Sequence, residues 1–228
     1  MPSPRTTRQD IHEILCKTLK VNEIFFSLQG ETRFIGLPTI FIRLTGCPLR
    51  CNYCDTDYAF HDGEKMTIEN ILQNISNYRT RYVTVTGGEP LAQKHCHDLL
   101  TLLCDEGFDV SLETSGAICV EHVDERVYKI LDIKTPASGE SDKNNFNNLQ
   151  YIKDSDQIKF VIVDKFDYQW SRDIIKEHQL NERCEILFSP AYETLDPEKL
   201  AGWILQDQLP VRMQIQLHKY IWGNVPGR

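Results

Sequence analysis

Residues 46–56 read Gly-Cys-Pro-Leu-Arg-Cys-Asn-Tyr-Cys-Asp-Thr and follow the apolar run at residues 40–44 almost directly. Cys47, Cys51 and Cys54 therefore form a C-x3-C-x2-C array within one loop. Thiolates gathered in this way bind soft metal centres: zinc, copper(I) or an iron–sulfur cluster. Three ligands are one fewer than a closed four-cysteine zinc site or an all-cysteine [4Fe–4S] cluster needs. The loop thus predicts a metal centre with one open position, where chemistry can take place.

Length and composition predict one globular domain. The chain has 228 residues, of which 41% are hydrophobic and 25% charged. A net charge of −8 argues against a broad surface for direct nucleic-acid binding. No run approaches the roughly 18–20 apolar residues of a membrane span, and residues 1–10 lack the apolar core of a signal peptide. We therefore expect a cytoplasmic protein that does not contact a membrane.

The other five cysteines are isolated in the sequence. We expect them to be small buried apolar side chains in a reducing compartment, because a chain of this size without an export signal rarely needs disulfides. These residues are Cys16, Cys96, Cys104, Cys119 and Cys184.

Strand and helix signals alternate along the chain. Thr67 and Asp196 are expected helix N-caps, with Pro197 at the first helical position, and Gly107 is placed to end a leucine-rich helix. This alternation predicts a parallel α/β sheet with right-handed crossovers. We expect residues 1–20 to form a tail and short helix, residues 21–228 a single domain, and residues 137–150 an exposed loop. The expected strands cover residues 23–27, 38–44, 82–86, 108–112, 127–133, 157–163, 185–188 and 211–217.

Polar or glycine-rich segments follow several expected strands. They are Gly87-Gly88-Glu89, Thr114-Ser115-Gly116, Lys134-Thr135 and Ser189-Pro190. Ligands bind at the carboxyl ends of parallel strands. Helix caps use the same residue types, so each segment alone is weak evidence, but together they predict a binding rim.

The cysteine array after one strand and Gly-Gly-Glu-Pro at residues 87–90 after the next resemble the radical S-adenosylmethionine (SAM) superfamily. The resemblance implies that the three cysteines bind three irons of a [4Fe–4S] cluster. SAM would chelate the fourth iron through its amino and carboxylate groups, which accounts for the open position. A structural zinc site would instead need a fourth ligand, for which His61 is the nearest candidate.

Further segments resemble the 7-carboxy-7-deazaguanine synthase family, from about residue 21 to the C-terminus. The resemblance implies a shortened, partial TIM-type parallel β/α barrel, a homodimer and a lyase of queuosine and 7-deazapurine biosynthesis. The reaction it implies converts 6-carboxy-5,6,7,8-tetrahydropterin into 7-carboxy-7-deazaguanine with release of ammonia, through a 5′-deoxyadenosyl radical and a Mg²⁺-assisted ring contraction. An electron donor such as a flavodoxin or ferredoxin is also implied. The segments are Ser-Leu-Gln-Gly-Glu at 27–31, Phe-Ile-Arg-Leu-Thr-Gly-Cys at 41–47, Cys-Asp-Thr at 54–56, Thr-Gly-Gly-Glu-Pro at 86–90, Glu-Thr-Ser-Gly at 113–116 and Gln-Leu-His-Lys-Tyr at 216–220.

The resemblance assigns roles to individual residues. Thr56 would be a ligand of Mg²⁺, a hard cation that prefers oxygen; the alternative is an ordinary turn threonine. In place of the Ser-Pro-Lys of other members this chain has Asp132-Ile133-Lys134, so the transfer is firmest for Lys134, and Ser189 aligns only loosely. The implied SAM contacts are Tyr53, Asp55, Gly87, Gly88, Glu89, Ser115, Asp132, Ile133, Lys134 and Ser189. The implied substrate contacts are Leu28, Gln29, Gly30, Arg43 and Thr86.

Two of these assignments keep an open alternative. Arg43 lies in an apolar strand and needs an anionic partner, either the substrate carboxylate or an acidic neighbour. His218 and Lys219 follow the last expected strand, where they are either site residues or a solvated strand end. Some family members place their C-terminal carboxylate in the pocket, and for Arg228 this stays open.

Two other functions compete with this interpretation. A glycyl-radical activating enzyme would also be short but would act on a protein, and the segments around Gln29 and Thr56 disfavour it. A non-catalytic iron–sulfur or zinc protein is the other alternative. Simple electron carriers close all four iron positions with protein ligands, which this loop does not supply.

Overall fold

The computed structural model describes residues 8–228, so the expected tail at residues 1–7 lies outside the described residues. The helices are α1 (Arg8–Leu15), α2 (Ile68–Ile75), α3 (Cys96–Asp105), α4 (Lys165–Glu177), α5 (Pro197–Gln206) and α6 (Leu217–Trp222). The strands are β1 (Thr18–Leu28), β2 (Pro38–Leu44), β3 (Glu64–Thr67), β4 (Tyr82–Gly87), β5 (Asp109–Thr114), β6 (Tyr128–Ile133), β7 (Gln157–Ile162), β8 (Glu185–Pro190) and β9 (Arg212–Met213).

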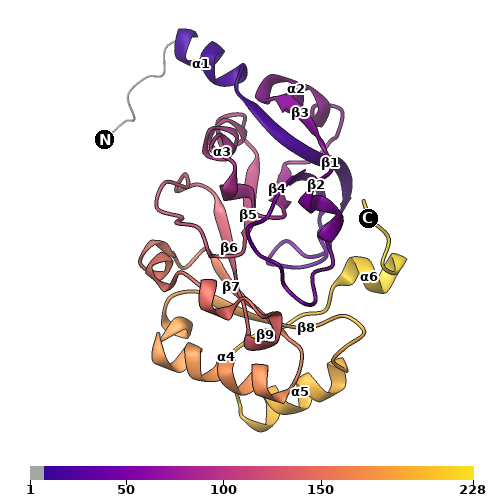
Figure 1. The fold of residues 1–228 in the computed structure, drawn as a ribbon, viewed down its shortest axis with the longest axis vertical. Helices are drawn as coiled ribbons and strands as arrows, with labels where there is room; N and C mark the ends of the chain where they lie inside the picture. The colour runs from indigo at the N-terminus through magenta and orange to yellow at the C-terminus, as the bar shows by residue number, and fades with distance from the viewer. Residues whose placement is uncertain (1–7) are drawn as a thin grey trace.

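All of these strands join one sheet in the order β3-β1-β2-β4-β5-β6-β7-β8-β9. β1 runs antiparallel to β2 and β3, whereas β2 and β4 to β9 are parallel to one another. The sheet curves from the indigo strands to the yellow ones, and β3 and β9 remain at its two open edges (Figure 1). The expected partial parallel barrel is confirmed, with an antiparallel pair added at its first edge.

The parallel strands are short apolar runs buried on both faces, as βα crossovers require. Ile40, Ile42, Val83 and Val85 are fully buried at the centre of the core. In the register of β2 and β4, Ile42 pairs with Val85 and Leu44 with Gly87. The cysteine loop and the Gly-Gly turn therefore leave the sheet side by side.

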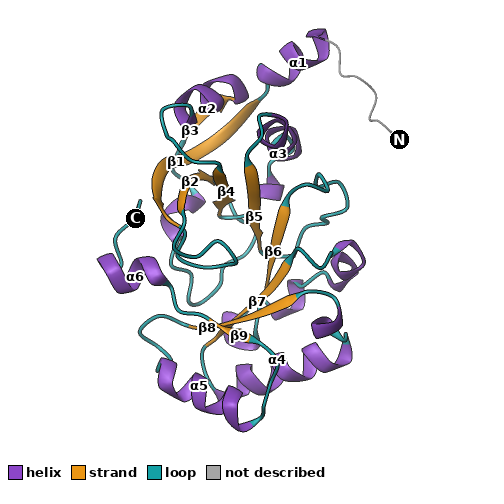
Figure 2. Cartoon of the chain, turned by 180° about the vertical axis from the view of Figure 1, so that it is seen from behind, coloured by secondary structure: helices purple, strands orange, loops and turns teal. Residues whose placement is uncertain are grey.

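Helices cover the outer face of the curved sheet, with α3, α4 and α5 visible outside the strands in Figure 2. The expected caps are confirmed: the Thr67 hydroxyl accepts from the Asn70 N–H, and the Asp196 carboxylate accepts from the Glu198 N–H with Pro197 at the first helical position. Gly107 follows α3 with a left-handed φ of 85°, a conformation that suits glycine. These three helices therefore leave the inner face of the curved sheet uncovered.

Three expectations about local structure were wrong. The first strand is not confined to residues 23–27, because Leu19 and Val21 are buried where β1 pairs with β3, so the sheet begins inside the expected extension. The last strand shrinks from residues 211–217 to Arg212–Met213, and α6 begins at Leu217. Residues 137–150 form short 3₁₀ turns with Ser138 and Asn148 fully buried, because the Asn148 side chain bonds the loop after β5.

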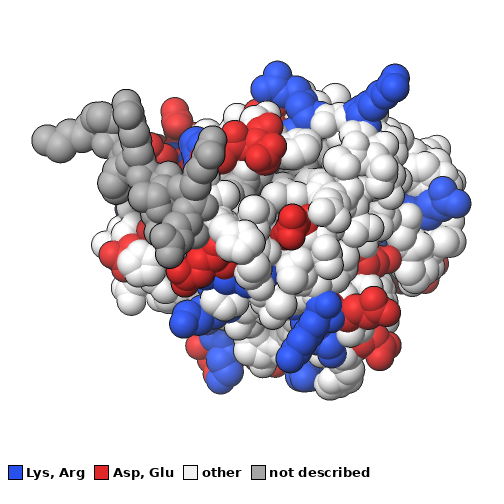
Figure 3. All heavy atoms as spheres, turned by 90° about the horizontal axis from the view of Figure 1, so that it is seen from above, with Lys and Arg blue, Asp and Glu red and all other residues white. Residues whose placement is uncertain are grey.

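The exposure of the remaining five cysteines agrees only in part with the sequence expectation. Cys96 and Cys184 are buried as expected and Cys104 is partly so, but Cys16 and Cys119 are exposed. Basic and acidic side chains are interspersed over the face drawn in Figure 3. Within residues 8–228, none of the helices has the length and apolar character needed to cross a membrane.

Candidate active site

A cavity of about 470 Å³ lies at the carboxyl ends of the parallel strands. Its wall is built by the segments after β1, β2, β4, β5, β6 and β8, closed on one side by α6 and the C-terminal residues. The predicted binding rim therefore exists as one enclosure, because parallel strands deliver their carboxyl ends to the same edge.

Cys47, Cys51 and Cys54 all line this cavity as partly exposed free thiols. Burial raises the pKa of each thiol, that of Cys51 to about 11, so a bound metal would have to displace their protons. Among the described residues, no three Cys, His, Asp or Glu side chains gather closely enough to hold a single metal ion. Three cysteines facing one cavity supply the donor set for a cluster with three ligated irons, and His61, the fourth ligand considered for zinc, is not among the residues that line the cavity.

The cysteine loop is braced from two neighbouring segments. The Gly46 N–H donates to the Ala59 carbonyl (2.9 Å), which belongs to the 3₁₀ turn Asp57–Phe60. The Asn52 N–H donates to the Ser138 carbonyl (2.9 Å), and the Asn52 amide donates to the Ala137 carbonyl (3.0 Å). These bonds anchor the loop to the 3₁₀ turn that follows it and to the segment after β6.

Gly87 and Gly88 are packed tightly against that loop. A Cβ on Gly88 would lie 2.3 Å from the Gly46 carbonyl oxygen and 2.8 Å from the Cys47 Cβ. At Gly87, where φ is 153°, it would lie 2.2 Å from the Leu44 carbonyl oxygen. Only glycine lets β4 and the cysteine loop approach so closely. The Gly-Gly signal in the sequence therefore has a steric cause in the structure.

Glu89 lies behind the cavity wall and is fully buried. Its carboxylate accepts hydrogen bonds from the Ser115 N–H (2.7 Å), the Leu91 N–H (3.0 Å) and the Thr114 hydroxyl (2.8 and 2.9 Å). The Ser115 hydroxyl donates to it as well, at 2.5 Å. Glu89 thus holds the segment after β5 against that after β4, and Ser115 itself reaches the cavity.

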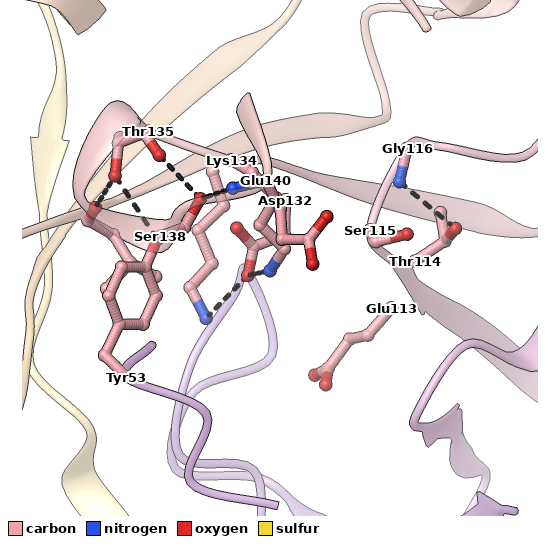
Figure 4. Close-up of polar contacts among 12 residues, drawn as sticks. Tyr53, Glu113, Thr114, Ser115, Gly116, Asp132, Lys134, Thr135, Ser138 and Glu140 are labelled. Atoms are coloured by element: carbon pink, nitrogen blue, oxygen red, sulfur yellow. Dashed lines mark hydrogen bonds and ion pairs between the residues drawn. The ribbon is translucent and has the colours of Figure 1, made fainter. Parts of the chain in front are cut away.

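The strand end of β6 contributes a buried ion pair to the cavity. Lys134 lies 3.2 Å from Asp132, and both side chains line the wall. Burial alone would lower the pKa of Lys134, but Asp132 together with the neighbouring Cys51 and Tyr53 outweighs burial and raises that pKa. Figure 4 shows this pair with Tyr53 beside Thr135, whose hydroxyls are 3.3 Å apart. Ile133 alternates to the opposite face of β6 and packs in the core, so its side chain lies outside the cavity.

Two of the residues expected to bind substrate contact a carboxylate that the sequence analysis missed. Leu28, Gln29, Gly30, Arg43 and Thr86 all line the cavity. The Gln29 amide donates to Glu113 Oε1 (3.3 Å) and the Thr86 hydroxyl to Glu113 Oε2 (3.0 Å). Burial and then the nearby Glu31 carboxylate raise the pKa of Glu113. Glu113 stands within the segment at residues 113–116, but nothing local in the sequence shows that its side chain faces Gln29.

Arg43 pairs with an acidic neighbour, Glu23, which is one of the two kinds of partner expected for it. Its Nε–H donates to Glu23 Oε1 at 2.7 Å, because Glu23 pairs with Arg43 in the register of β1 and β2. The Tyr58 hydroxyl donates to the same oxygen (3.0 Å). Arg43 still lines the cavity and retains further guanidinium N–H groups for a second anion.

The helix α6 carries His218 and Lys219 into the site, so neither residue is a solvated strand end. The Leu217 N–H donates to the Gly30 carbonyl (3.0 Å), and His218 packs directly against Gly30. Lys219 pairs with Asp55 at 2.5 Å. Burial alone would raise the pKa of Asp55, but Lys219 outweighs it and lowers that pKa below its usual range.

The remaining cavity wall includes the end of the cysteine loop and the C-terminus. The Thr56 hydroxyl donates to Asp55 Oδ1 (2.9 Å). Thr56 lines the cavity together with Ser189, Tyr192 and the C-terminal Arg228. Lys159 and Glu31 also lie on the wall as a buried ion pair that the sequence analysis missed. A lysine inside the apolar run at residues 157–163 was the available signal for it.

Known proteins resemble this chain in sequence. The Radical SAM superfamily model matches residues 41–133. The 7-carboxy-7-deazaguanine synthase of Chlorobaculum tepidum is 45% identical over 208 residues, covering 90% of this chain and 94% of the relative. That of Koribacter versatilis is 40% identical over 219 residues, covering 90% and 97%. The chain belongs to the 7-carboxy-7-deazaguanine synthase family.

The fold comparison agrees with membership of the 7-carboxy-7-deazaguanine synthase family. The crystal structure of QueE from Escherichia coli matches with a TM-score of 0.74 at 24% identity, covering 88% of this chain and 95% of that one. At this identity the match speaks for the fold alone. Family membership sets aside the glycyl-radical activating enzyme and the non-catalytic metal protein as alternatives.

Proposed function

We propose that this chain is a lyase that converts 6-carboxy-5,6,7,8-tetrahydropterin into 7-carboxy-7-deazaguanine with release of ammonia, in queuosine and 7-deazapurine biosynthesis. The observation that carries the proposal is the coincidence of two facts. Relatives named for this product align over about 90% of the chain. The three cysteines, the Gly-Gly turn and the residues expected to contact substrate line one cavity.

In this proposal Cys47, Cys51 and Cys54 would hold a [4Fe–4S] cluster with one iron left for SAM. When bound, these groups would supply one-electron chemistry for hydrogen abstraction, whereas the protein orients them and excludes water. The close approach of Gly87 and Gly88 leaves backbone accessible to the SAM amino group. Tyr53, Asp55, Ser115, Asp132, Lys134 and Ser189 supply the polar contacts around it.

Two of the expected SAM residues act indirectly in this arrangement. Glu89 positions Ser115 through its buried hydrogen bonds and does not touch the ligand. Ile133 contributes its backbone, since its side chain is in the core. The full burial of Glu89 and the core position of the Ile133 side chain support these two assignments.

The pterin would lie between the turn at residues 29–31 and the β4 and β5 strand ends. Glu113, held by Gln29 and Thr86, presents a carboxyl group whose raised pKa favours a protonated, hydrogen-bond-donating form. Arg43 offers its remaining guanidinium N–H groups to the substrate carboxylate, a pairing that planar guanidinium favours. Leu28 and Gly30 bring backbone groups to the ring edge. Such positioning is the protein's main contribution, because reacting atoms must be held roughly 3–3.5 Å apart.

The remaining elements of the proposal concern partners. Thr56 would ligate Mg²⁺ through its hydroxyl oxygen, with the substrate and water completing the shell. A flavodoxin or ferredoxin would reduce the cluster, and the enzyme would be a cytoplasmic homodimer. The eight free cysteines agree with a reducing compartment.

The test is direct turnover. The cluster is reconstituted anaerobically, and SAM, Mg²⁺, dithionite and 6-carboxy-5,6,7,8-tetrahydropterin are supplied. We expect 7-carboxy-7-deazaguanine and ammonia in equal amounts, and neither with Cys51→Ala. Absence of both products from wild-type protein with a spectroscopically intact cluster would refute the proposal, and full activity of Cys51→Ala would refute the cluster assignment.

A further inference from the structure

Alternating charges run along one wall of the cavity. The Lys159 ammonium on β7 pairs with the Glu31 carboxylate and lies 3.9 Å from Asp132 on β6, which in turn pairs with Lys134 just after that strand. The side chains of Lys159 and Glu31 are only 13% and 9% exposed. The pair links the segment after β1, which carries Glu31, to β7, which carries Lys159. Neither residue has a role in the chemistry described so far.

Both members of the pair are ionised. Burial alone would lower the pKa of Lys159, but the carboxylates of Glu31 and Asp132 outweigh it and raise that pKa. Burial alone would raise the pKa of Glu31, but Lys159 outweighs it and lowers that pKa. The other titratable groups facing the two residues are Glu113 on β5, Lys134 just after β6, His218 on α6 and Asp55 in the cysteine loop.

Glu31 is joined to the rest of the turn at residues 29–31 by a side-chain hydrogen bond. The Glu31 N–H donates to the Gln29 side-chain oxygen (3.1 Å), and the Gln29 amide donates to Glu113. Glu31 Oε1 and Asp132 Oδ1 are buried without a hydrogen-bond partner among residues 8–228. Lys159 thus lies between the Glu31 and Asp132 carboxylates. Each of these two carboxylates keeps one oxygen able to accept a hydrogen bond from a ligand.

We propose that Lys159 is a positioning residue for the substrate: by pairing with Glu31 it holds the turn at residues 29–31 where that turn meets the pterin. The inference rests on the proposed function for the identity of the ligand. Without the Lys159 ammonium, Glu31 would lose the ion-pair partner that it has among the described residues, and Asp132 would keep only Lys134. A buried carboxylate that loses its counter-ion is strongly destabilised, so the turn would move or Glu31 would take up a proton.

A double-mutant cycle separates this role from volume filling or direct ligand contact. The variants are Lys159→Met, Glu31→Gln and the two combined, each assayed for kcat and KM with 6-carboxy-5,6,7,8-tetrahydropterin. Its affinity is also measured by equilibrium dialysis without reductant, when no turnover occurs. Lys159→Met should raise KM and weaken binding by about tenfold or more while kcat changes by less than about threefold, as for a loss of ground-state binding. The double variant should bind no worse than either single variant, since a neutral pair needs no counter-ion.

The matched control is Lys143→Met, which removes an exposed ion pair with Asp142 and should leave kcat and KM unchanged. If the two single losses multiply in the double variant, Lys159 acts independently of Glu31 and the inference is wrong. If Lys159→Met does not fold, Glu31→Gln is compared with the double variant: equal binding supports the pairing, and a further loss in the double variant overturns it. Failure of the proposed function would appear separately, as wild-type protein that forms no deazaguanine.

Discussion

Gly88→Ala tests the close contact between β4 and the cysteine loop. The new Cβ would lie 2.3 Å from the Gly46 carbonyl oxygen, whereas such contacts essentially never fall below 3.0 Å, so the two segments must part by roughly 0.7 Å. That movement strains the Glu89 N–H bond to the Gly46 carbonyl, now 2.8 Å, and displaces Cys47. Overpacking costs about 1–3 kcal/mol and a weakened hydrogen bond about 1 kcal/mol. The free energy of unfolding should therefore fall by about 2–4 kcal/mol.

The assay combines thermal unfolding of the cluster-free protein with iron content after anaerobic reconstitution. For a chain of this length the loss corresponds to a Tm lower by about 5–15 °C, and the displaced Cys47 should reduce bound iron to roughly half or less of the wild-type value. Gly202→Ala on α5 is the matched control, because no atom lies within 4 Å of its Cβ position; it should leave the iron content intact and keep Tm at or slightly above the wild-type value, since alanine suits a helix interior better than glycine. A Gly88→Ala protein with wild-type Tm and a full iron complement would refute the steric reasoning.

Three further variants probe other parts of the site. Glu89→Gln should lower the free energy of unfolding by about 2–4 kcal/mol, because an amide nitrogen cannot accept from the Ser115 N–H. Urea unfolding measures this change. The control Glu177→Gln, at an exposed position, should stay within about 0.5 kcal/mol of wild type. Folding raises the pKa of Glu113, so the folded chain keeps the Glu113 proton to a higher pH than the unfolded chain does. The stability of the wild type relative to Glu113→Gln should therefore fall as pH rises from about 4 through that raised pKa. A stability difference that is flat between about pH 4 and pH 8 would contradict the raised pKa. Thr56→Val should weaken the dependence of turnover on Mg²⁺, and an unchanged Mg²⁺ titration would remove Thr56 from the ligands.

The parts of the site that sequence reasoning located are carried by short local signals. The cysteine spacing, the β-branched run before it and the Gly-Gly turn are each readable within about ten residues, and the helix caps at Thr67 and Asp196 have the same local character. The binding rim followed from one topological rule, that parallel strands end at a common edge. These expectations needed no knowledge of which side chains meet.

The missed features depend on contacts between distant segments. Glu113 receives bonds from Gln29 and Thr86, which lie 84 and 27 residues away along the chain. Lys159 finds Glu31 across 128 residues. No periodicity in the sequence encodes such pairings, because they arise from the register and curvature of the sheet.

The errors at the C-terminal end have a different cause. Residues 211–217 alternate apolar and polar side chains, which favours a strand by pattern alone. Only Arg212 and Met213 pair with β8, at the edge of the sheet, and the chain then turns so that α6 can contact Gly30 and Asp55. Tertiary contacts with the cavity wall therefore override the local pattern.

The central claim is that the cluster-bound SAM and the pterin react within this one cavity. Its most direct test uses 6-carboxy-5,6,7,8-tetrahydropterin deuterated at C6, incubated anaerobically with the reconstituted protein, SAM, Mg²⁺ and dithionite, followed by mass spectrometry of the recovered SAM. If the 5′-deoxyadenosyl radical derived from SAM takes the C6 hydrogen and SAM is then regenerated, deuterium should appear in the 5′ position of SAM while 7-carboxy-7-deazaguanine and ammonia accumulate. Unlabelled SAM and no deazaguanine, from protein whose reduced cluster is visible by electron paramagnetic resonance, would contradict the account.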